Sequence, residues 1–129
     1  MIIGIGCDLS STERWEDEDM RERLMNRYYS IEEAEYVRSR GRPAKDSAAG
    51  IFAAKEAFVK ALGTGFIGIP LAEIGVTHDA LGAPKYSLTG KAAEAFRQSG
   101  ADRCHLSISH DGGMAMAFCI LEKREEVST

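Results

Sequence analysis

The sequence predicts an α+β fold, in which a small antiparallel or mixed sheet packs against one long central helix in a single domain, residues 1–129. Two observations carry this prediction. The alanine-rich segment 51–62 has the composition and length of a buried helix, and the chain closes with two alternating strands around a tight turn. A length of 129 residues fits one domain, and 44% hydrophobic with 28% charged residues is typical of globular proteins.

The first predicted element is a strand over residues 2–7, a short β-branched run that ends at Asp8. Gly4, Gly6 and Asp8 share one parity and therefore one face of this strand. Because that face carries almost no side chains, we expect another element to pack closely against it.

The next segment, residues 12–27, is densely charged and predicts one or two exposed helices, with Trp15 and Leu24 as anchors. Ser30 followed by Glu33 makes a capping box, which begins a helix expected to run to about residue 40.

The clearest helix covers residues 51–62, with Asp46 or Ser47 as its cap and Gly63 as its stop. Its many alanines would allow it to lie flat on the bare face of the first strand. The remaining expected elements are strands at 74–78 and 86–88, a helix from Thr89 to about 99, and a hairpin of 105–109 and 114–121.

Composition excludes several classes of function. The net charge of −4 leaves no global basic field for nucleic acid. Cys7, Cys104 and Cys119 are odd in number and lack zinc spacing, which favours reduced thiols in the cytoplasm. No signal peptide or membrane span is predicted from the N-terminal residues.

Asp8, Glu56 and Lys60 are the candidate metal and phosphate residues. Taken alone, Asp8 is a turn residue, and Glu56 with Lys60 is an exposed ion pair one helical turn apart. The alternative is that both carboxylates bind Mg²⁺, which takes one or two carboxylates in proteins, while Lys60 meets a phosphate. The apolar surroundings of Glu56 and Lys60 in the helix favour the second interpretation.

The segment 63–68 matches the pattern GxGxxG but ends a helix instead of opening one, so it is not a dinucleotide fingerprint. It is either a helix-ending loop or a backbone cradle for phosphate. In the segment 107–111, neighbouring serine and histidine side chains of one strand point to opposite faces and cannot form a catalytic triad. His110 is then a turn histidine or a hydrogen-bonding partner of a phosphate or nucleotide.

Together and in this order, four pieces of the chain resemble the holo-acyl-carrier-protein synthases, which are small phosphopantetheinyl transferases. The pieces are residues 3–8, the Phe-Ala-Ala-Lys-Glu-Ala block within 52–61, the Gly-Thr-Gly at 63–65, and 107–110. The resemblance covers essentially the whole chain, and the central block is its most specific part.

The resemblance implies the phosphopantetheinyl transferase fold and a homotrimer with active sites at its subunit interfaces. Asp8 and Glu56 would bind Mg²⁺, and Lys60 would meet the pyrophosphate of coenzyme A. Arg14 would contact the acyl carrier protein. The backbone would contribute at Gly63, Thr64 and Gly65, and the adenosine end of coenzyme A would lie near Pro84 and His110.

The implied reaction is attack of a carrier serine on the β-phosphate of coenzyme A, with release of adenosine 3′,5′-bisphosphate. Glu56, directly or through a metal-bound water, is the candidate acceptor of the serine proton, so Asp8, Glu56 and Lys60 are the candidate catalytic residues. Arg21 lies seven residues after Arg14 and would share its face if one helix is continuous.

Two other classes of function compete with this interpretation. A non-catalytic module that binds coenzyme A or a carrier protein would not need Asp8, Glu56 and Lys60 together. A magnesium-dependent nucleotide hydrolase would be expected to carry a P-loop or a cluster of carboxylates, and the sequence has neither.

Overall fold

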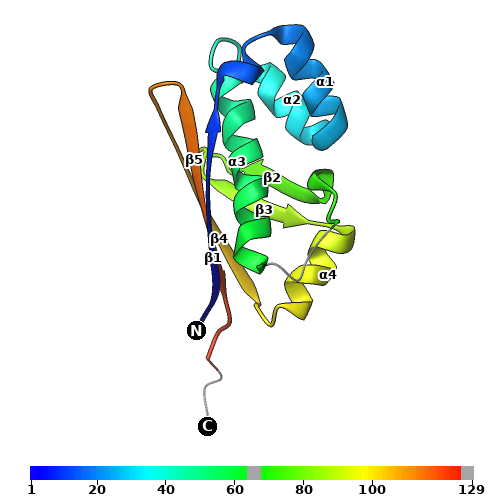
Figure 1. Ribbon diagram of the computed structural model, residues 1–129, viewed down its shortest axis with the longest axis vertical. Helices are drawn as coiled ribbons and strands as arrows, with labels where there is room; N and C mark the ends of the chain where they lie inside the picture. Colours follow the sequence, from blue (N-terminus) through cyan, green and yellow to red (C-terminus); the bar gives the residue numbers. More distant parts are fainter. Residues whose placement is uncertain (64–67, 126–129) are drawn as a thin grey trace.

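The computed structural model describes residues 1–63 and 68–125 and has the expected α+β architecture (Figure 1). The elements in chain order are β1 (Ile2–Ser11), η1 (Glu13–Trp15), α1 (Glu18–Tyr28), α2 (Ile31–Ser39), α3 (Ala44–Leu62), η2 (Leu71–Glu73), β2 (Ile74–His78), β3 (Pro84–Leu88), α4 (Gly90–Gln98), β4 (Arg103–Asp111) and β5 (Met114–Glu122). No helix within these ranges is long and apolar enough to cross a membrane.

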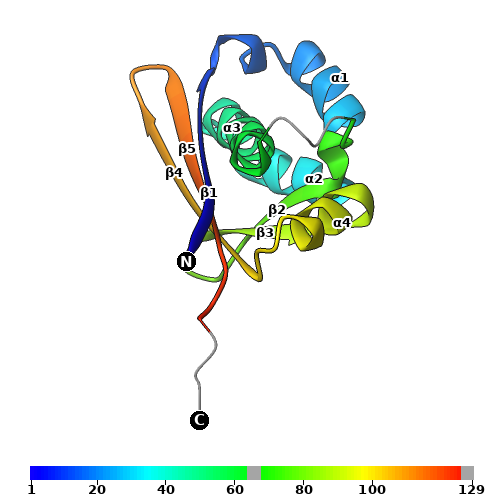
Figure 2. The same cartoon turned by 60° about the horizontal axis from the view of Figure 1, so that its bottom comes forward.

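The strands form two antiparallel sheets, one of three strands in the order β1-β5-β4 and one of β2 with β3. The helix α3 lies across one face of the three-stranded sheet, with α2 and the smaller sheet on its other side (Figure 2). Its alanines 48, 49, 53, 54 and 57 are fully buried, so the central helix lies within the core as the sequence predicts.

The strands are longer than their residues suggest, and this corrects the expected places of Asp8 and His110. The first strand continues past Asp8 to Ser11 because β5 pairs with it along its whole length, Asp8 with Ala117 and Ser11 with Met114. The terminal hairpin closes on Gly112 and Gly113 alone, at φ 56° and 79°, as a two-residue turn requires. His110 therefore lies within β4 and not in the turn.

The helix α3 begins at Ala44, so the expectation that Asp46 or Ser47 caps it was wrong. Pro43 occupies the N-cap position, and Asp46 lies in the first turn, where a carboxylate is favoured by the helix dipole. The stop at Gly63 is confirmed, with φ 87°, a conformation that favours glycine.

The bare face of β1 is covered by α3 as expected, at backbone contact distance. A Cβ atom on Gly4 would lie 2.1 Å from the carbonyl oxygen of Ala61, and one on Gly6 would lie 1.9 Å from that of Ala57. Only glycine allows this approach, because the neighbouring atoms belong to the helix backbone and cannot turn away.

The charged segment folds as the short helix η1 followed by α1. Asp17 caps α1 by accepting a hydrogen bond from the backbone N–H of Met20 at 2.9 Å. Trp15 is fully buried, with its ring centroid 5.4 Å from that of Tyr29 and 5.7 Å from that of Phe52, which confirms its anchoring role. The capping box of Ser30 and Glu33 at the start of α2 is also confirmed.

A buried ion pair that the sequence does not reveal connects four of these elements. The ammonium of Lys55 donates to Glu33 Oε1 at 2.7 Å and to the carbonyl oxygens of Leu71 and Ile74 at 2.8 and 2.9 Å. The other carboxylate oxygen of Glu33 accepts from the backbone N–H of Val76 at 2.9 Å. Burial lowers the pKa of Lys55, and the charge and hydrogen bond of Glu33 oppose this shift.

We expect Lys55→Met to destabilise the protein by about 3–5 kcal/mol, because it leaves the Glu33 carboxylate buried without its counter-charge. Urea unfolding measures the loss. The matched control is Lys60→Met on the same helix, which removes an exposed charge and should change stability by less than about 1 kcal/mol. Equal losses in the two variants would contradict the assignment of Lys55 as a buried structural cation.

Candidate functional site

Asp8, Glu56 and Lys60 lie together where α3 packs on β1. The ammonium of Lys60 donates to Asp8 Oδ1 at 2.9 Å and to the carbonyl oxygen of Cys7 at 3.1 Å. Asp8 points toward α3 because it shares the face of Gly4 and Gly6, and its side chain is only 16% exposed. The Lys60 side chain is 54% exposed, although its neighbours in the helix are mostly apolar.

Glu56 is half-buried beside this pair. Burial raises the pKa of Glu56, and the negative charge of Asp8 raises it further, while Lys60 and Arg14 act in the opposite direction. The hydrogen bond to Asp8 raises the pKa of Lys60 and holds the ammonium in its charged form. Two carboxylates are thus held close enough to repel each other, with one movable cation beside them.

This set of donors fits a Mg²⁺ ion. Carboxylate oxygens are hard ligands, and Mg²⁺ is usually held by one or two of them together with waters and substrate phosphates. The repulsion between Asp8 and Glu56 is the kind that a divalent cation relieves. Within residues 1–63 and 68–125, no group of three or more histidine, cysteine or acidic side chains forms an all-protein metal cage.

Of the phosphate loop expected after α3, Gly63 and Gly68 lie among the described residues. The backbone N–H of Gly63 donates to the carbonyl oxygen of Lys60 at 3.2 Å, so this group ends the helix. Thr64 and Gly65 lie outside the described residues.

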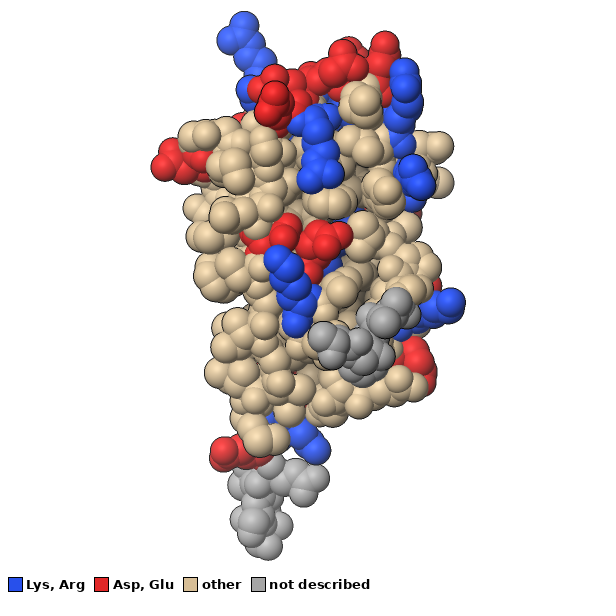
Figure 3. All heavy atoms as spheres, in the orientation of Figure 1, with Lys and Arg blue, Asp and Glu red and all other residues tan. Residues whose placement is uncertain are grey.

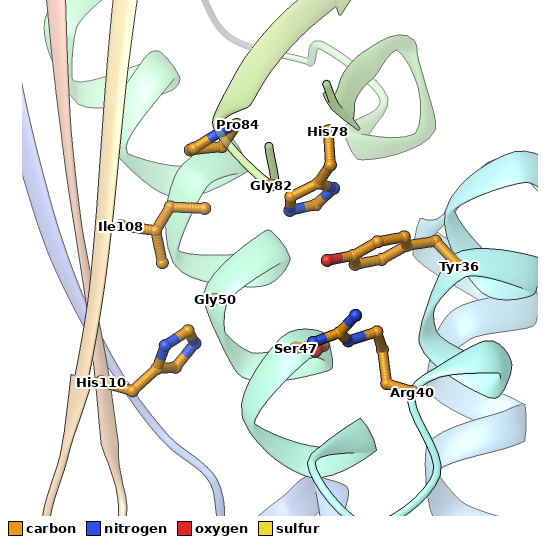
Figure 4. A pocket seen from close by; sticks show the side chains of 9 residues that line it. All are labelled: Tyr36, Arg40, Ser47, Gly50, His78, Gly82, Pro84, Ile108 and His110. Atoms are coloured by element: carbon orange, nitrogen blue, oxygen red, sulfur yellow. The ribbon is translucent and has the colours of Figure 1, made fainter. Parts of the chain in front are cut away.

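His110 and Pro84 line a hollow of about 160 Å³ on the other side of α3 (Figure 4). The ring nitrogen Nε2 of His110 lies 2.8 Å from the carbonyl oxygen of Asp46. Gly50 makes room for this ring, since a Cβ atom on Gly50 would lie 2.8 Å from the same nitrogen. The structure therefore places Pro84 and His110, which are 26 positions apart in the sequence, in the same hollow.

The same hollow is lined by Tyr36, Arg40 and His78, which the sequence analysis missed. The rings of Tyr36 and His78 stack with centroids 3.9 Å apart, and the Arg40 guanidinium lies 5.6 Å from the Tyr36 centroid. Burial and the charge of Arg40 lower the pKa of His78. Figure 4 shows these side chains and His110 pointing toward one another, and the described residues that line the hollow include no acidic side chain. The arrangement suits an anionic or aromatic group.

The two groups of candidate residues lie on different strands of the three-stranded sheet. Asp8 lies on β1 and His110 on β4, and these are the two outer strands of the three-stranded sheet.

The face of the three-stranded sheet that points away from α3 is largely apolar along β1 and β5, whereas along β4 it carries polar residues such as His105 and Ser107. Ile5 and Leu9 on β1 are 59% and 61% exposed, and Phe118, which pairs with Cys7, is 43% exposed. Met114, at the start of β5, is 37% exposed next to this row. We refer to Ile5, Leu9, Met114 and Phe118 as the outer apolar face.

Arg14 and Arg21 do not share one helix face, because they lie on two separate helices, η1 and α1. The Arg14 guanidinium lies over the Phe52 ring at 4.8 Å, and Arg21 donates to the carbonyl oxygen of Trp15 at 2.9 Å. On the face shown in Figure 3, basic and acidic side chains are interspersed over the end of the molecule where α1 and α2 lie. Any attraction of an acidic partner would therefore be local.

Comparisons with known proteins agree on one family. The family model described as the 4′-phosphopantetheinyl transferase superfamily matches residues 4–119. The holo-[acyl-carrier-protein] synthase of Trichlorobacter lovleyi is 51% identical over 126 residues, which cover 95% of this chain and 98% of that protein. The corresponding synthase of Treponema denticola is 43% identical over 122 residues, with 95% and 99% covered.

Solved structures give the same result. The holo-[acyl-carrier-protein] synthase of Neisseria meningitidis matches with a TM-score of 0.82 and 35% identity, over 95% of this chain and 100% of that one. The synthase of Bacillus anthracis, solved in complex with CoA (3′,5′-ADP), matches with a TM-score of 0.76 and 34% identity, over 96% and 99%. Sequence and fold thus agree along almost the whole length, and this chain belongs to the 4′-phosphopantetheinyl transferase superfamily.

Proposed function

We propose that this chain is a holo-acyl-carrier-protein synthase, which transfers the 4′-phosphopantetheine group of coenzyme A to a serine of an apo acyl carrier protein. The observation that carries the proposal is the group of Asp8, Glu56 and Lys60 on adjoining faces of β1 and α3. A chain that only bound coenzyme A would have no need to hold two repelling carboxylates beside an ammonium.

In this proposal Asp8 and Glu56 hold Mg²⁺, which when bound supplies positive charge to the pyrophosphate of coenzyme A. Lys60, on a flexible and largely exposed stem, binds a pyrophosphate oxygen and neutralises charge that develops there. The backbone at Gly63, Thr64 and Gly65 is proposed to contribute to the same phosphate subsite.

The serine oxygen of the carrier protein forms a bond to the β-phosphorus, and the bond from that phosphorus to the bridging oxygen breaks. Adenosine 3′,5′-bisphosphate leaves with the bridging oxygen. The serine proton is proposed to go to Glu56, the half-buried carboxylate beside Asp8 and Lys60.

The adenosine end of coenzyme A is proposed to bind at the hollow of Pro84 and His110, where Arg40 offers a positive charge to the 3′-phosphate. This hollow and Asp8 lie on the two outer strands of the sheet, and we propose, as the family resemblance implies, that one molecule of coenzyme A is shared by two chains. The outer apolar face supports such an assembly, since large exposed apolar patches mark interaction sites. The proposed assembly is a homotrimer with an active site at each subunit interface.

The proposed location is the cytoplasm. All three cysteines, Cys7, Cys104 and Cys119, are free thiols, as is usual in a reducing compartment.

The proposed activity is tested by incubating the protein with coenzyme A, Mg²⁺ and an apo carrier protein, and weighing the carrier by mass spectrometry. We expect the carrier to gain the mass of phosphopantetheine, and Asp8→Ala and Glu56→Ala to transfer at least about a hundredfold more slowly while remaining folded. Binding of coenzyme A without a mass gain would favour the non-catalytic module. Hydrolysis to free phosphopantetheine would identify a hydrolase instead.

Shared active sites predict complementation between two inactive variants. Asp8→Ala and His110→Ala chains, mixed in equal amounts and allowed to exchange, should recover about a quarter of the wild-type rate, since one interface in four joins the intact halves. Phe118→Glu, which places a charge on the outer apolar face, should shift the protein toward monomers in sedimentation velocity experiments. Mixtures with no recovered activity, together with an active monomer, would contradict the shared-site proposal.

The carrier protein is proposed to dock against Arg14. We expect Arg14→Glu to raise KM for the carrier by tenfold or more, about 1.4 kcal/mol, with little change in KM for coenzyme A. Higher salt should weaken binding of the carrier to the wild type and so reduce the difference in carrier KM between the wild type and Arg14→Glu. Lys91→Glu, an exposed lysine in the first turn of α4, is the control for the change in net charge. A carrier KM that is indifferent to both Arg14→Glu and salt would place the docking surface elsewhere.

A further inference from the structure

We propose that Lys60 acts as a stand-in cation for the divalent metal, so that its ammonium occupies Asp8 in the metal-free protein and must leave this carboxylate before the metal binds. This inference rests on the proposed metal site of Asp8 and Glu56. It adds a second role for Lys60, which opposes metal binding until coenzyme A is present.

The geometry of the ion pair supports the exchange. The Lys60 ammonium lies 2.9 Å from Asp8 Oδ1 and 3.1 Å from the carbonyl oxygen of Cys7, so two of its three hydrogens are directed into the site. Asp8 is fixed on the middle of a paired strand and is only 16% exposed. Lys60 is therefore the partner that can move, because its stem is long, flexible and 54% exposed.

The charges around the site make Lys60 the cation that a bound metal would repel most strongly. Glu56 and Asp8 already repel each other. Arg14 also acts on Glu56, but its guanidinium rests over the Phe52 ring. A divalent cation between the two carboxylates would repel an ammonium hydrogen-bonded to one of them, so metal entry and departure of Lys60 belong to one equilibrium.

The ion pair between Lys60 and Asp8 costs little to break, and breaking it frees the ammonium for coenzyme A. An ion pair with one exposed partner is weak, so a metal can displace it. The freed ammonium can then reach a pyrophosphate oxygen. By linkage, a pyrophosphate that draws Lys60 away from Asp8 tightens metal binding by the same factor as the metal tightens pyrophosphate binding. Lys60 would thus make the site bind metal and coenzyme A together in preference to either one alone.

The test is titration of the protein with MnCl₂ without coenzyme A, with free Mn²⁺ followed by its electron paramagnetic resonance signal. Lys60→Met should bind Mn²⁺ about three- to tenfold more tightly than the wild type, because the competing ammonium is absent. Lys45→Met is the matched control. It removes the same charge from the same helix, where Lys45 pairs with Glu16 at 3.5 Å, and should change the affinity less than about twofold.

Addition of saturating coenzyme A gives a second readout. It should tighten Mn²⁺ binding by a larger factor in the wild type than in Lys60→Met, because only the wild type has a lysine to withdraw. Equal factors in the two proteins, or unchanged Mn²⁺ affinity in Lys60→Met, would overturn the exchange.

Asp8→Asn separates this failure from failure of the proposed function. If Asp8→Asn loses Mn²⁺ binding while Lys60→Met binds as the wild type does, the metal site stands and the stand-in role is wrong. If Asp8→Asn binds Mn²⁺ as tightly as the wild type, the metal site itself is wrong and the exchange falls with it.

Discussion

The contact between the backbones of β1 and α3 is the constraint on which the candidate site depends. Two glycines of the strand lie against carbonyl oxygens of the helix at Ala57 and Ala61, with no room for a methyl group at either. This contact fixes the helix along the strand, so that the next residue of the same parity, Asp8, lies within hydrogen-bonding reach of Lys60 on α3. The carboxylate of Asp8, the ammonium of Lys60 and the carboxylate of Glu56 are neighbours for this reason.

The buried pair of Lys55 and Glu33 holds the other side of the same helix. Lys55 directly precedes Glu56, and its ammonium binds carbonyl oxygens at Leu71 and Ile74, where the chain returns after the segment that follows α3. Lys55 and Glu56 are adjacent in sequence, but their side chains point in different directions and have different roles. Lys55 is fully buried and structural, while Glu56 faces Asp8 at the surface. An α3 held between β1 and this ion pair has little freedom to rotate, which keeps both carboxylates in register.

Local patterns in the sequence predicted the elements that depend on local chemistry. The capping box at Ser30, the alanine-rich helix and the terminal hairpin are each encoded by neighbouring residues, and all three are confirmed. The two glycines on one face of the first strand predicted the close approach of a helix, and this is confirmed as well. Asp8 and Lys60 were candidates from their residue types and positions, the family resemblance assigned them to one site, and the structure places them together.

Features that depend on residues far apart in the sequence were not predicted. The true end of β1 is set by pairing with β5, about a hundred positions away, so a single strand pattern placed Asp8 at its end wrongly. Nothing near Lys55 marks it as buried, because its partners come from Glu33 and from two carbonyl groups. Tyr36 and His78 belong to no motif in the sequence. They line the hollow together because their rings stack in the folded chain.

The free energy of unfolding of Gly6→Ala is the most direct test of the β1–α3 contact. The added methyl group would lie 1.9 Å from the carbonyl oxygen of Ala57 and 2.7 Å from the backbone nitrogen of Ala61, so the strand and the helix must separate. We predict a loss of more than about 3 kcal/mol in urea unfolding, or no cooperative folding at all. A variant that unfolds within about 1 kcal/mol of the wild type would contradict the claim that this contact positions the site.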